Sequence, residues 1–222
     1  MFTNHVEDAV KLTVCGATGG TGQEVVRQAL EAGHEVTAVV RDPARLPDGL
    51  TGARVVTADM TDPRALRPAV EGRDAVISGL GPRDRAQARA GVAAPVTRVI
   101  LAAMAECGVR RLVAVSASPL GTSPPGDPFL DRRILAPVIR AFLRDVYADL
   151  GAMEKAIAAS DTDWTVMRPP RLLNGPATGR YRLAVGAGLA AGRTIARSDL
   201  AHAMLAVLDD PATVRRTVGI AY

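Results

Sequence analysis

The chain has 222 residues, of which 48% are hydrophobic and 23% charged, and its formal net charge is +4. This composition is typical of a globular protein with one sizeable core or two small ones. The apolar stretches are shorter than the ~18 residues that span a bilayer, and the N-terminal segment lacks the basic and apolar regions of a signal peptide. The sequence therefore predicts a cytoplasmic protein without a membrane partner.

The positive charge does not indicate nucleic-acid binding. Lys11 and Lys155 are the two lysines among 27 basic residues, and the arginines are spread along the chain rather than gathered in a run. Aromatic residues make up 3% of the sequence, too few for an aromatic stacking platform. Cys15 and Cys107 have neither disulfide-framework nor metal-ligand spacing, so no metal is expected.

Most of the chain alternates short β-rich runs with helical patterns, which predicts right-handed parallel βαβ units. Strands are expected at 11–15, 34–41, 53–59, 74–81 and 110–117, and helices at 22–33, 62–72 and 94–108. The expected fold is therefore α/β, a Rossmann-like doubly wound parallel sheet.

The pattern changes after Ser116. A loop with four prolines is expected at 118–128, then a long helix at 129–160 broken near Pro137. Further strands are expected at 163–170, 179–185 and 217–222, and a helix at 198–210. Ser198 is expected to cap that last helix, with Asp199 near the positive end of its dipole. We expect a single domain over 1–222 with a small C-terminal elaboration and a flexible tail at 1–10.

The stretch "CGATGGTG" places four glycines directly after the first strand. Three of them form a GxxGxxG pattern between a strand and a helix, the context of a dinucleotide-binding fingerprint. The first glycine permits a tight turn, the second lets a pyrophosphate approach the backbone, and the third lets helix and strand pack closely. The alternative is a glycine-rich turn without a ligand. The candidate cofactor residues in this loop are Gly16, Thr18, Gly19, Gly20, Thr21 and Gly22.

Arg41 ends the second expected strand, where an NAD-binding protein places an acidic residue on the ribose 2′-hydroxyl. A guanidinium suits a 2′-phosphate, which it binds through paired charge-assisted hydrogen bonds, and Arg45 follows in the next turn. This arrangement favours NADP(H) over NAD(H). Asp42 is the alternative contact, since its carboxylate is next to the same position.

With these residues in place, the chain resembles the atypical short-chain dehydrogenases of the NAD(P)H-binding, NmrA-like type, and within them the flavin reductases of the biliverdin reductase B kind. The resemblance covers most of 12–208 and is weaker over 120–148. The matching stretches are "GATGGTG", "GHEVTAVVRDPARLP", "GRDAVISGLGPRD", "ILAAMAECGVRRLVAVSAS", "MEKAIAASDTDWTVMRPP" and "GPATGRY".

The resemblance also implies roles for residues outside the glycine loop. It places two arginines at the 2′-phosphate, an acid–methionine pair beside the adenine, a short turn under the adenosine, a serine as the catalytic residue near the nicotinamide, and two prolines against its carboxamide. An arginine lies at the mouth of the site, and a second arginine is a candidate substrate contact. The arginines at the 2′-phosphate are Arg41 and Arg45, the acid–methionine pair is Asp59 and Met60, and the turn is Gly79, Leu80 and Gly81. The serine is Ser116, and the prolines are Pro169 and Pro170. Arg83 is the arginine at the mouth of the site, and Arg171 is the candidate substrate contact.

Each implied role has a simpler alternative. Asp59 is equally suited to accept hydrogen bonds in a turn, Ser116 to be a hydroxyl at a strand end, and Pro169–Pro170 to stop a strand. Arg171 stands where the resembled reductases have a histidine, which argues against tetrapyrrole reduction. Arg171 is equally suited to bind an anionic substrate and to form an ion pair with a neighbouring acidic side chain.

Typical short-chain dehydrogenases use a Tyr-x-x-x-Lys pair as proton donor, but here Tyr147 is followed four residues later by Gly151. Glu154 and Lys155 match the atypical pattern instead, either as surface residues or as residues that support the site. We therefore expect an NADPH-dependent oxidoreductase that passes hydride to a flat small-molecule acceptor such as a flavin or quinone. The alternatives are a redox-sensing regulatory protein that binds NADP(H) without turnover and, less favoured, a nucleotide-sugar epimerase.

Overall fold

The structure is a computed structural model that describes residues 9–81, 90–118 and 144–222. Its strands are β1 (Lys11–Cys15), β2 (Glu35–Val40), β3 (Arg54–Thr57), β4 (Ala75–Ser78), β5 (Arg111–Val115), β6 (Asp163–Arg168), β7 (Arg171–Leu173), β8 (Arg182–Val185), β9 (Thr194–Ala196) and β10 (Arg216–Ala221). The α-helices are α1 (Gly20–Glu31), α2 (Pro63–Val70), α4 (Ala93–Cys107), α6 (Arg144–Ala158) and α7 (Arg197–Ala206). Short 3₁₀ turns occupy Pro43–Arg45, Asp48–Leu50 and Pro211–Thr213.

The main sheet has eight strands in the order β3-β2-β1-β4-β5-β6-β10-β8. The strands from β3 to β10 pair in parallel, and β8 is antiparallel to β10 at the edge. The expected Rossmann-like doubly wound fold is confirmed. A separate parallel pair, β7 with β9, was not predicted.

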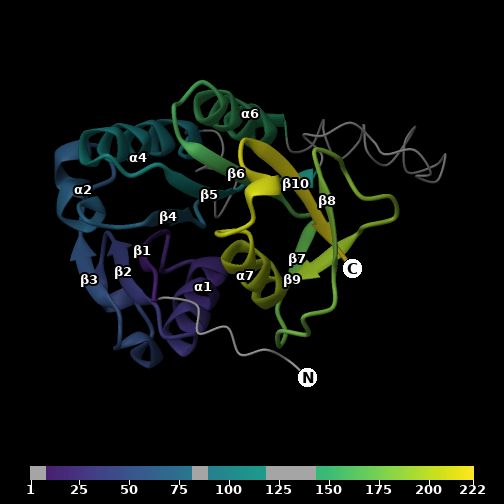
Figure 1. The fold of residues 1–222 in the computed structure, drawn as a ribbon, viewed down its shortest axis with the longest axis horizontal. Coiled ribbons are helices and arrows are strands. Elements are labelled where there is room, and N and C mark those ends of the chain that lie inside the picture. Colours follow the sequence, from purple (N-terminus) through teal and green to yellow (C-terminus); the bar gives the residue numbers. More distant parts are fainter. Residues whose placement is uncertain (1–8, 82–89, 119–143) are drawn as a thin grey trace.

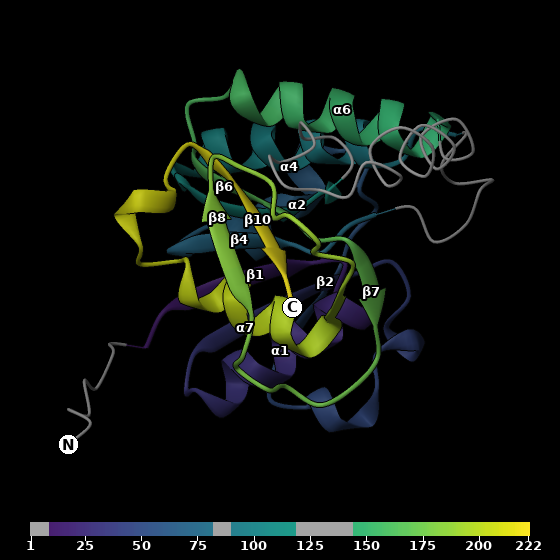
Figure 2. The same cartoon turned by 90° about the vertical axis from the view of Figure 1, so that its right-hand side faces the viewer.

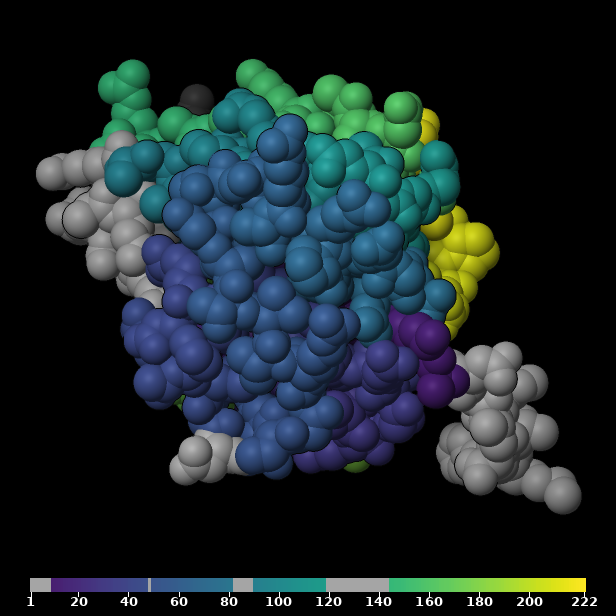
Figure 3. Space-filling view, turned by 90° about the vertical axis from the view of Figure 1, so that its left-hand side faces the viewer, coloured from purple at the N-terminus to yellow at the C-terminus, as the bar shows by residue number. Residues whose placement is uncertain are grey.

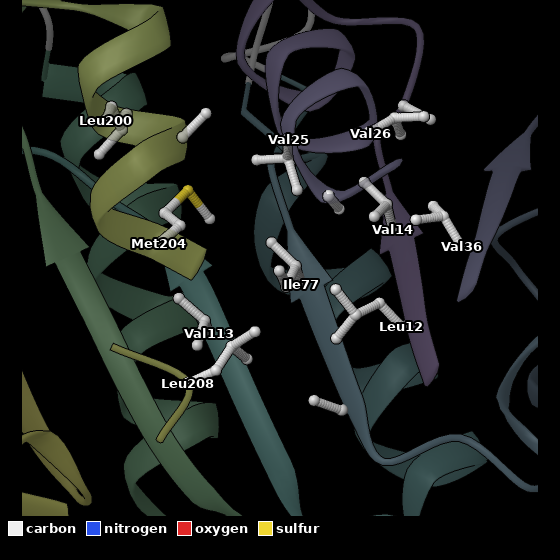
Figure 4. Close-up of a cluster of buried hydrophobic side chains, with 14 of the residues drawn as sticks. Leu12, Val14, Val25, Val26, Val36, Ile77, Val113, Leu200, Met204 and Leu208 are labelled. Atoms are coloured by element: carbon white, nitrogen blue, oxygen red, sulfur yellow. The ribbon is translucent and has the colours of Figure 1, made fainter. Parts of the chain in front are cut away.

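Helices cover both faces of the main sheet (Figure 1). On one face, α1 and α7 pack against a core in which Val25, Leu200 and Met204 meet Leu12 and other strand residues (Figure 4). The other face is covered by α2, α4 and α6, which contribute a second apolar cluster. Because the central strands, such as β1, β2 and β4, are buried on both faces, their sequences are nearly continuous apolar runs.

The two ends of the sheet are formed by different parts of the chain. Figure 3 shows the β3 end, where the blue and teal N-terminal half of the chain forms the surface. Figure 2 shows the opposite end, where β8 lies in front and α7 lies beside α1. Val55 of β3 and Val185 of β8 are 41% and 46% exposed, as expected for edge strands.

Several predicted helix boundaries are confirmed by their caps. The Asp62 side chain accepts a hydrogen bond from the amide of Arg64 at the start of α2, with Pro63 at the first helical position. Gly108, at φ 72°, ends α4 in the left-handed conformation. Cys15 is the buried last residue of β1, within the strand expected at 11–15, and burial raises the pKa of its thiol to about 12.

The prediction that Ser198 caps the last helix is wrong. The helix α7 begins one residue earlier, its cap residue is Ala196, and no side chain caps it. The Ser198 hydroxyl instead donates to the carbonyl of Gly175, 2.7 Å away. The expected break near Pro137 and most of the proline-rich loop lie outside the described residues, and the long helix is described from Arg144 onwards.

Candidate dinucleotide-binding site

The order of the main sheet reverses between β1 and β4, since β1 continues to β2 on one side and β4 to β5 on the other. Ligands of open α/β sheets bind beyond the carboxyl ends of the strands at such a point. The glycine loop follows β1 there, and Gly79–Gly81 follow β4. The amide of Gly79 donates to the carbonyl of Cys15 over 3.0 Å, so the two loops lie side by side.

Two glycines of the loop are required by the fold itself. Gly16 has a φ of +81°, and a Cβ there would lie 3.2 Å from the amide nitrogen of Leu80. A Cβ on Gly22 would overlap the carbonyl oxygen of Gly16 and lie 2.8 Å from its carbonyl carbon. These positions let α1 pack directly against the end of β1.

Gly19 is different because its space is not filled by the fold. Among the described residues beyond its chain neighbours, a Cβ there would contact the Gly16 carbonyl oxygen alone, at 3.3 Å. Its amide donates to that same oxygen over 2.9 Å, which closes the loop into a tight turn. The residue has extended angles, φ −86° and ψ 156°, so its backbone alone does not require glycine.

The helix α1 begins in this loop without a side-chain cap and without an acidic residue in its first turn. Its first amides therefore lack the carboxylate or hydroxyl acceptor that usually satisfies them, and they stand at the positive end of the helix dipole. A bound pyrophosphate would supply the missing acceptors. The loop therefore fits the dinucleotide predicted from the sequence, with Thr18, Gly20 and Thr21 placed around the same turn.

Arg41 and Arg45 are exposed beside this loop. Arg41 directly follows β2, whose Val39 is paired with Cys15 of β1, so Arg41 and the loop share one edge of the sheet. The Asp42 carboxylate accepts from the amide of Ala44 at 3.1 Å and caps the turn that contains Arg45. This local hydrogen bond accounts for Asp42 without a ribose contact.

The adenine-side candidates follow β3 and β4. Asp59 is exposed, whereas Met60 is buried in the apolar cluster beneath α2. Leu80 is half-buried and Gly81 is exposed. Arg83 lies outside the described residues.

Ser116 and Pro169 lie together where β5 and β6 end. The amide of Ser116 donates to the carbonyl of Met167, and the amide of Ser118 donates to the carbonyl of Pro169, each over 2.8 Å. The Ser116 hydroxyl is buried and has no hydrogen-bond partner within the described part of the chain. A buried hydroxyl without a partner is unfavourable, so this one is suited to a ligand at the strand ends.

The Glu154 carboxylate has a structural role. It forms a two-point ion pair with Arg168, at 3.0 Å and 2.5 Å, and both side chains are largely buried. Arg168 directly precedes the two prolines, so the pair holds the end of β6 against α6. Lys155 is exposed on α6. Of the two alternatives, Glu154 is the supporting residue and Lys155 the surface residue.

Asp199 forms a buried polar centre that sequence reasoning did not assign. Its carboxylate accepts from the amides of Thr178 and Gly179 at 2.8 Å, from the Thr178 hydroxyl at 2.8 Å and from the Tyr222 hydroxyl at 2.6 Å. Burial acts to raise the pKa of Asp199, but the hydrogen bonds from Tyr222, Gly179 and Thr178 together outweigh it and lower that pKa. The carboxylate therefore joins α7 to the segment before β8 and to the C-terminal residue.

These features agree with the comparisons to known proteins. The chain belongs to a family described as NAD(P)H-binding, which matches residues 16–211. A 3-diazoavenalumate denitrifying reductase from Streptomyces sp is 31% identical over 78% of this chain, which spans only 59% of the length of that relative.

Two solved structures share the fold. A short-chain dehydrogenase/reductase from Veillonella parvula DSM 2008 in complex with NADP has a TM-score of 0.80, at 18% identity over 96% of this chain and 94% of its own. An anaerobillin reductase from Escherichia coli O157:H7 has a TM-score of 0.74, at 19% identity over 95% of this chain and 96% of its own. Fold and family together define the class as an NAD(P)H-binding protein with a Rossmann-like fold.

None of the helices within the described ranges is both long enough and apolar enough to cross a membrane. The cytoplasmic location stays a prediction.

Proposed function

We propose that this chain is an NADPH-dependent reductase that passes hydride to a flat acceptor such as a flavin or quinone. The observation that carries the proposal is the chemistry at the ends of β5 and β6, where a buried serine hydroxyl and two prolines stand without the Tyr-x-x-x-Lys pair of carbonyl reductases. Tyr147 has Gly151 four residues on, within α6.

The residues would divide the cofactor between them. The glycine loop and the first amides of α1 would bind the pyrophosphate, and Arg41 with Arg45 would bind the 2′-phosphate. Ser116 would donate to or accept from the nicotinamide carboxamide, and Pro169–Pro170 would limit its rotation. When bound, the reduced nicotinamide supplies the hydride.

A flat acceptor fits this set of groups because it places little demand on protein acids. Reduced flavins and quinones take protons from solvent, so orientation and exclusion of water provide most of the catalysis. Arg171 begins β7 directly after Pro170 and is exposed, so its guanidinium is available to the phosphate of an anionic acceptor. A ketone, in contrast, needs a proton donor at the carbonyl oxygen.

We expect NADPH oxidation with FMN and with quinones, and little with simple ketones, when absorbance at the nicotinamide band is followed for a panel of acceptors. Arg171→Ala should raise KM for FMN more than for an uncharged quinone, because only FMN loses a charge partner. Arg216→Ala is the matched control, since it removes an exposed arginine at the start of β10, at the opposite end of the strands from the proposed site. Tight NADPH binding without turnover on any acceptor would refute the reductase and favour the regulatory protein.

The 2′-phosphate assignment gives a second test. Wild-type protein should bind NADPH more tightly than NADH, and Arg41→Glu should reverse that preference by weakening NADPH binding about 10–150-fold. The affinity falls because the charge-assisted hydrogen bonds between Arg41 and the 2′-phosphate are replaced by repulsion between two negative charges. Fluorescence titration with both cofactors measures the ratio. An unchanged ratio in the variant, or a wild type that prefers NADH, would remove Arg41 from the site.

A further inference from the structure

Arg197, the first residue of α7, lies against the first residue of α1 in the glycine loop. A Cβ built on Gly20 would lie 2.8 Å from the Cδ atom of Arg197 and 3.1 Å from its Nε atom. The α1 and α7 helices pack side by side, as Figures 1 and 2 both show. The absence of a side chain at Gly20 therefore leaves room for the arginine at the loop.

This position is unfavourable for a cation in the protein alone. Arg197 stands at the positive end of the α7 dipole and against the positive end of the α1 dipole. Its Nη1 atom donates to the neutral side-chain oxygen of Asn174 over 2.7 Å. None of the ion pairs among the described residues includes it.

The acid nearest in sequence is already occupied. Asp199 is the acidic residue in the first turn of α7, but its carboxylate is directed to Thr178, Gly179 and Tyr222. An anion at the glycine loop would compensate both helix ends and the guanidinium together. The family cofactor carries such an anion, its pyrophosphate, at this loop.

We propose that Arg197 binds the pyrophosphate of NAD(P)H from α7, as a further cofactor-binding residue opposite the backbone amides of α1. This inference rests on the cofactor of the proposed function, but on neither its acceptor nor its 2′-phosphate. The guanidinium that binds the phosphate also holds Asn174, which begins the segment between β7 and β8.

The arginine is held in place by neighbouring contacts. Each of the first three residues of α7 binds a different point of the 174–179 segment: Arg197 the side chain of Asn174, Ser198 the carbonyl of Gly175, and Asp199 the amide of Thr178. On the other side, the side-chain amide Nε2 of Gln28 in α1 donates to the Ser198 carbonyl over 2.9 Å. A guanidinium held this way loses less freedom when it binds an anion.

The test is calorimetric titration of NADPH and NADH into wild-type protein and Arg197→Met, which keeps an apolar stem against Gly20 but removes the charge. We expect both cofactors to bind about 10–100-fold more weakly, by the same factor, because they share the pyrophosphate. Arg197→Lys should recover part of the loss, since a lysine keeps the charge without the planar fork. Arg41→Ala should instead affect NADPH alone.

Arg216→Ala supplies the control for a unit change in net charge, and melting temperatures identify any variant that does not fold. The affinity of the wild type should also fall more steeply with added salt than that of Arg197→Met. Affinities of folded Arg197→Met within threefold of wild type for both cofactors, or a loss confined to NADPH, would overturn the inference. Absence of turnover in wild-type protein would overturn the proposed reduction while leaving this result intact.

Discussion

Replacing Gly19 by valine is expected to weaken NADPH binding by at least about 100-fold, equivalent to ~2.7 kcal/mol, while the chain stays folded. Valine tolerates the extended backbone angles at this position, and among the described residues its Cβ would contact just the Gly16 carbonyl oxygen, at 3.3 Å. Its branched methyl groups would then project into the space that the pyrophosphate needs. Titration by cofactor fluorescence and thermal melting by circular dichroism measure the two effects separately.

Gly22→Ala is the contrasting variant, because Gly22 belongs to the same loop but is required for the packing of α1 against β1. Its Cβ would overlap the Gly16 carbonyl, so β1 and α1 would have to separate, and a lower melting temperature is expected. NADPH affinity within threefold of wild type in folded Gly19→Val would show that the loop does not hold the pyrophosphate.

Sequence reasoning succeeded where the signals are local. The strand–helix alternation, the Asp62–Pro63 helix start and the Gly108 helix end each depend on neighbouring residues, and the structure has all of them. The glycine spacing predicted the turn at the switch point for the same reason, since close packing of a strand end on a helix start leaves no room for side chains at Gly16 and Gly22.

Prediction from the sequence failed where a partner distant in the chain competes with a local signal. Ser198 has the residue type and position of a helix cap, but the Gly175 carbonyl takes its hydroxyl. Asp149 was given no role from the sequence, and its buried carboxylate accepts from the amides of Ala93 and Ala94, at 2.7 and 2.9 Å, and so caps α4 from α6. Pairings across 23 and 56 residues leave no mark in either local pattern.

The same limit applies to the candidate site. Arg41 and the glycine loop were predicted because both adjoin strands whose order the βαβ rule determines. Arg197 was not, because its approach to Gly20 depends on how α7 returns to α1 after the β7–β9 pair, which was itself unpredicted. The glycine loop could therefore be predicted from the sequence, whereas the approach of Arg197 to it from the C-terminal part of the chain could not.

Asp199→Ala should lower the free energy of unfolding at pH 7 by about 3–5 kcal/mol, measured by urea denaturation. The substitution leaves the amides of Thr178 and Gly179 without their acceptor beneath α7 and removes the partner of Tyr222. Asp199→Asn should cost less, since an amide oxygen still accepts from the two amides but without the charge. Asp161→Asn, an exposed change of the same chemistry, should have almost no effect.

The acid dependence separates the charge of Asp199 from its packing. Because folding lowers the pKa of this carboxyl, its ionised form contributes stability fully above the pKa of an unfolded aspartate, about 3.9, and that contribution is lost as the pH falls through the lower folded value. Wild-type protein should therefore lose stability between about pH 5 and pH 3 more steeply than Asp199→Asn, in which this group no longer titrates. Parallel curves for the two proteins over that range would mean that the three hydrogen bonds from Thr178 and Gly179 hold that turn without help from the charge.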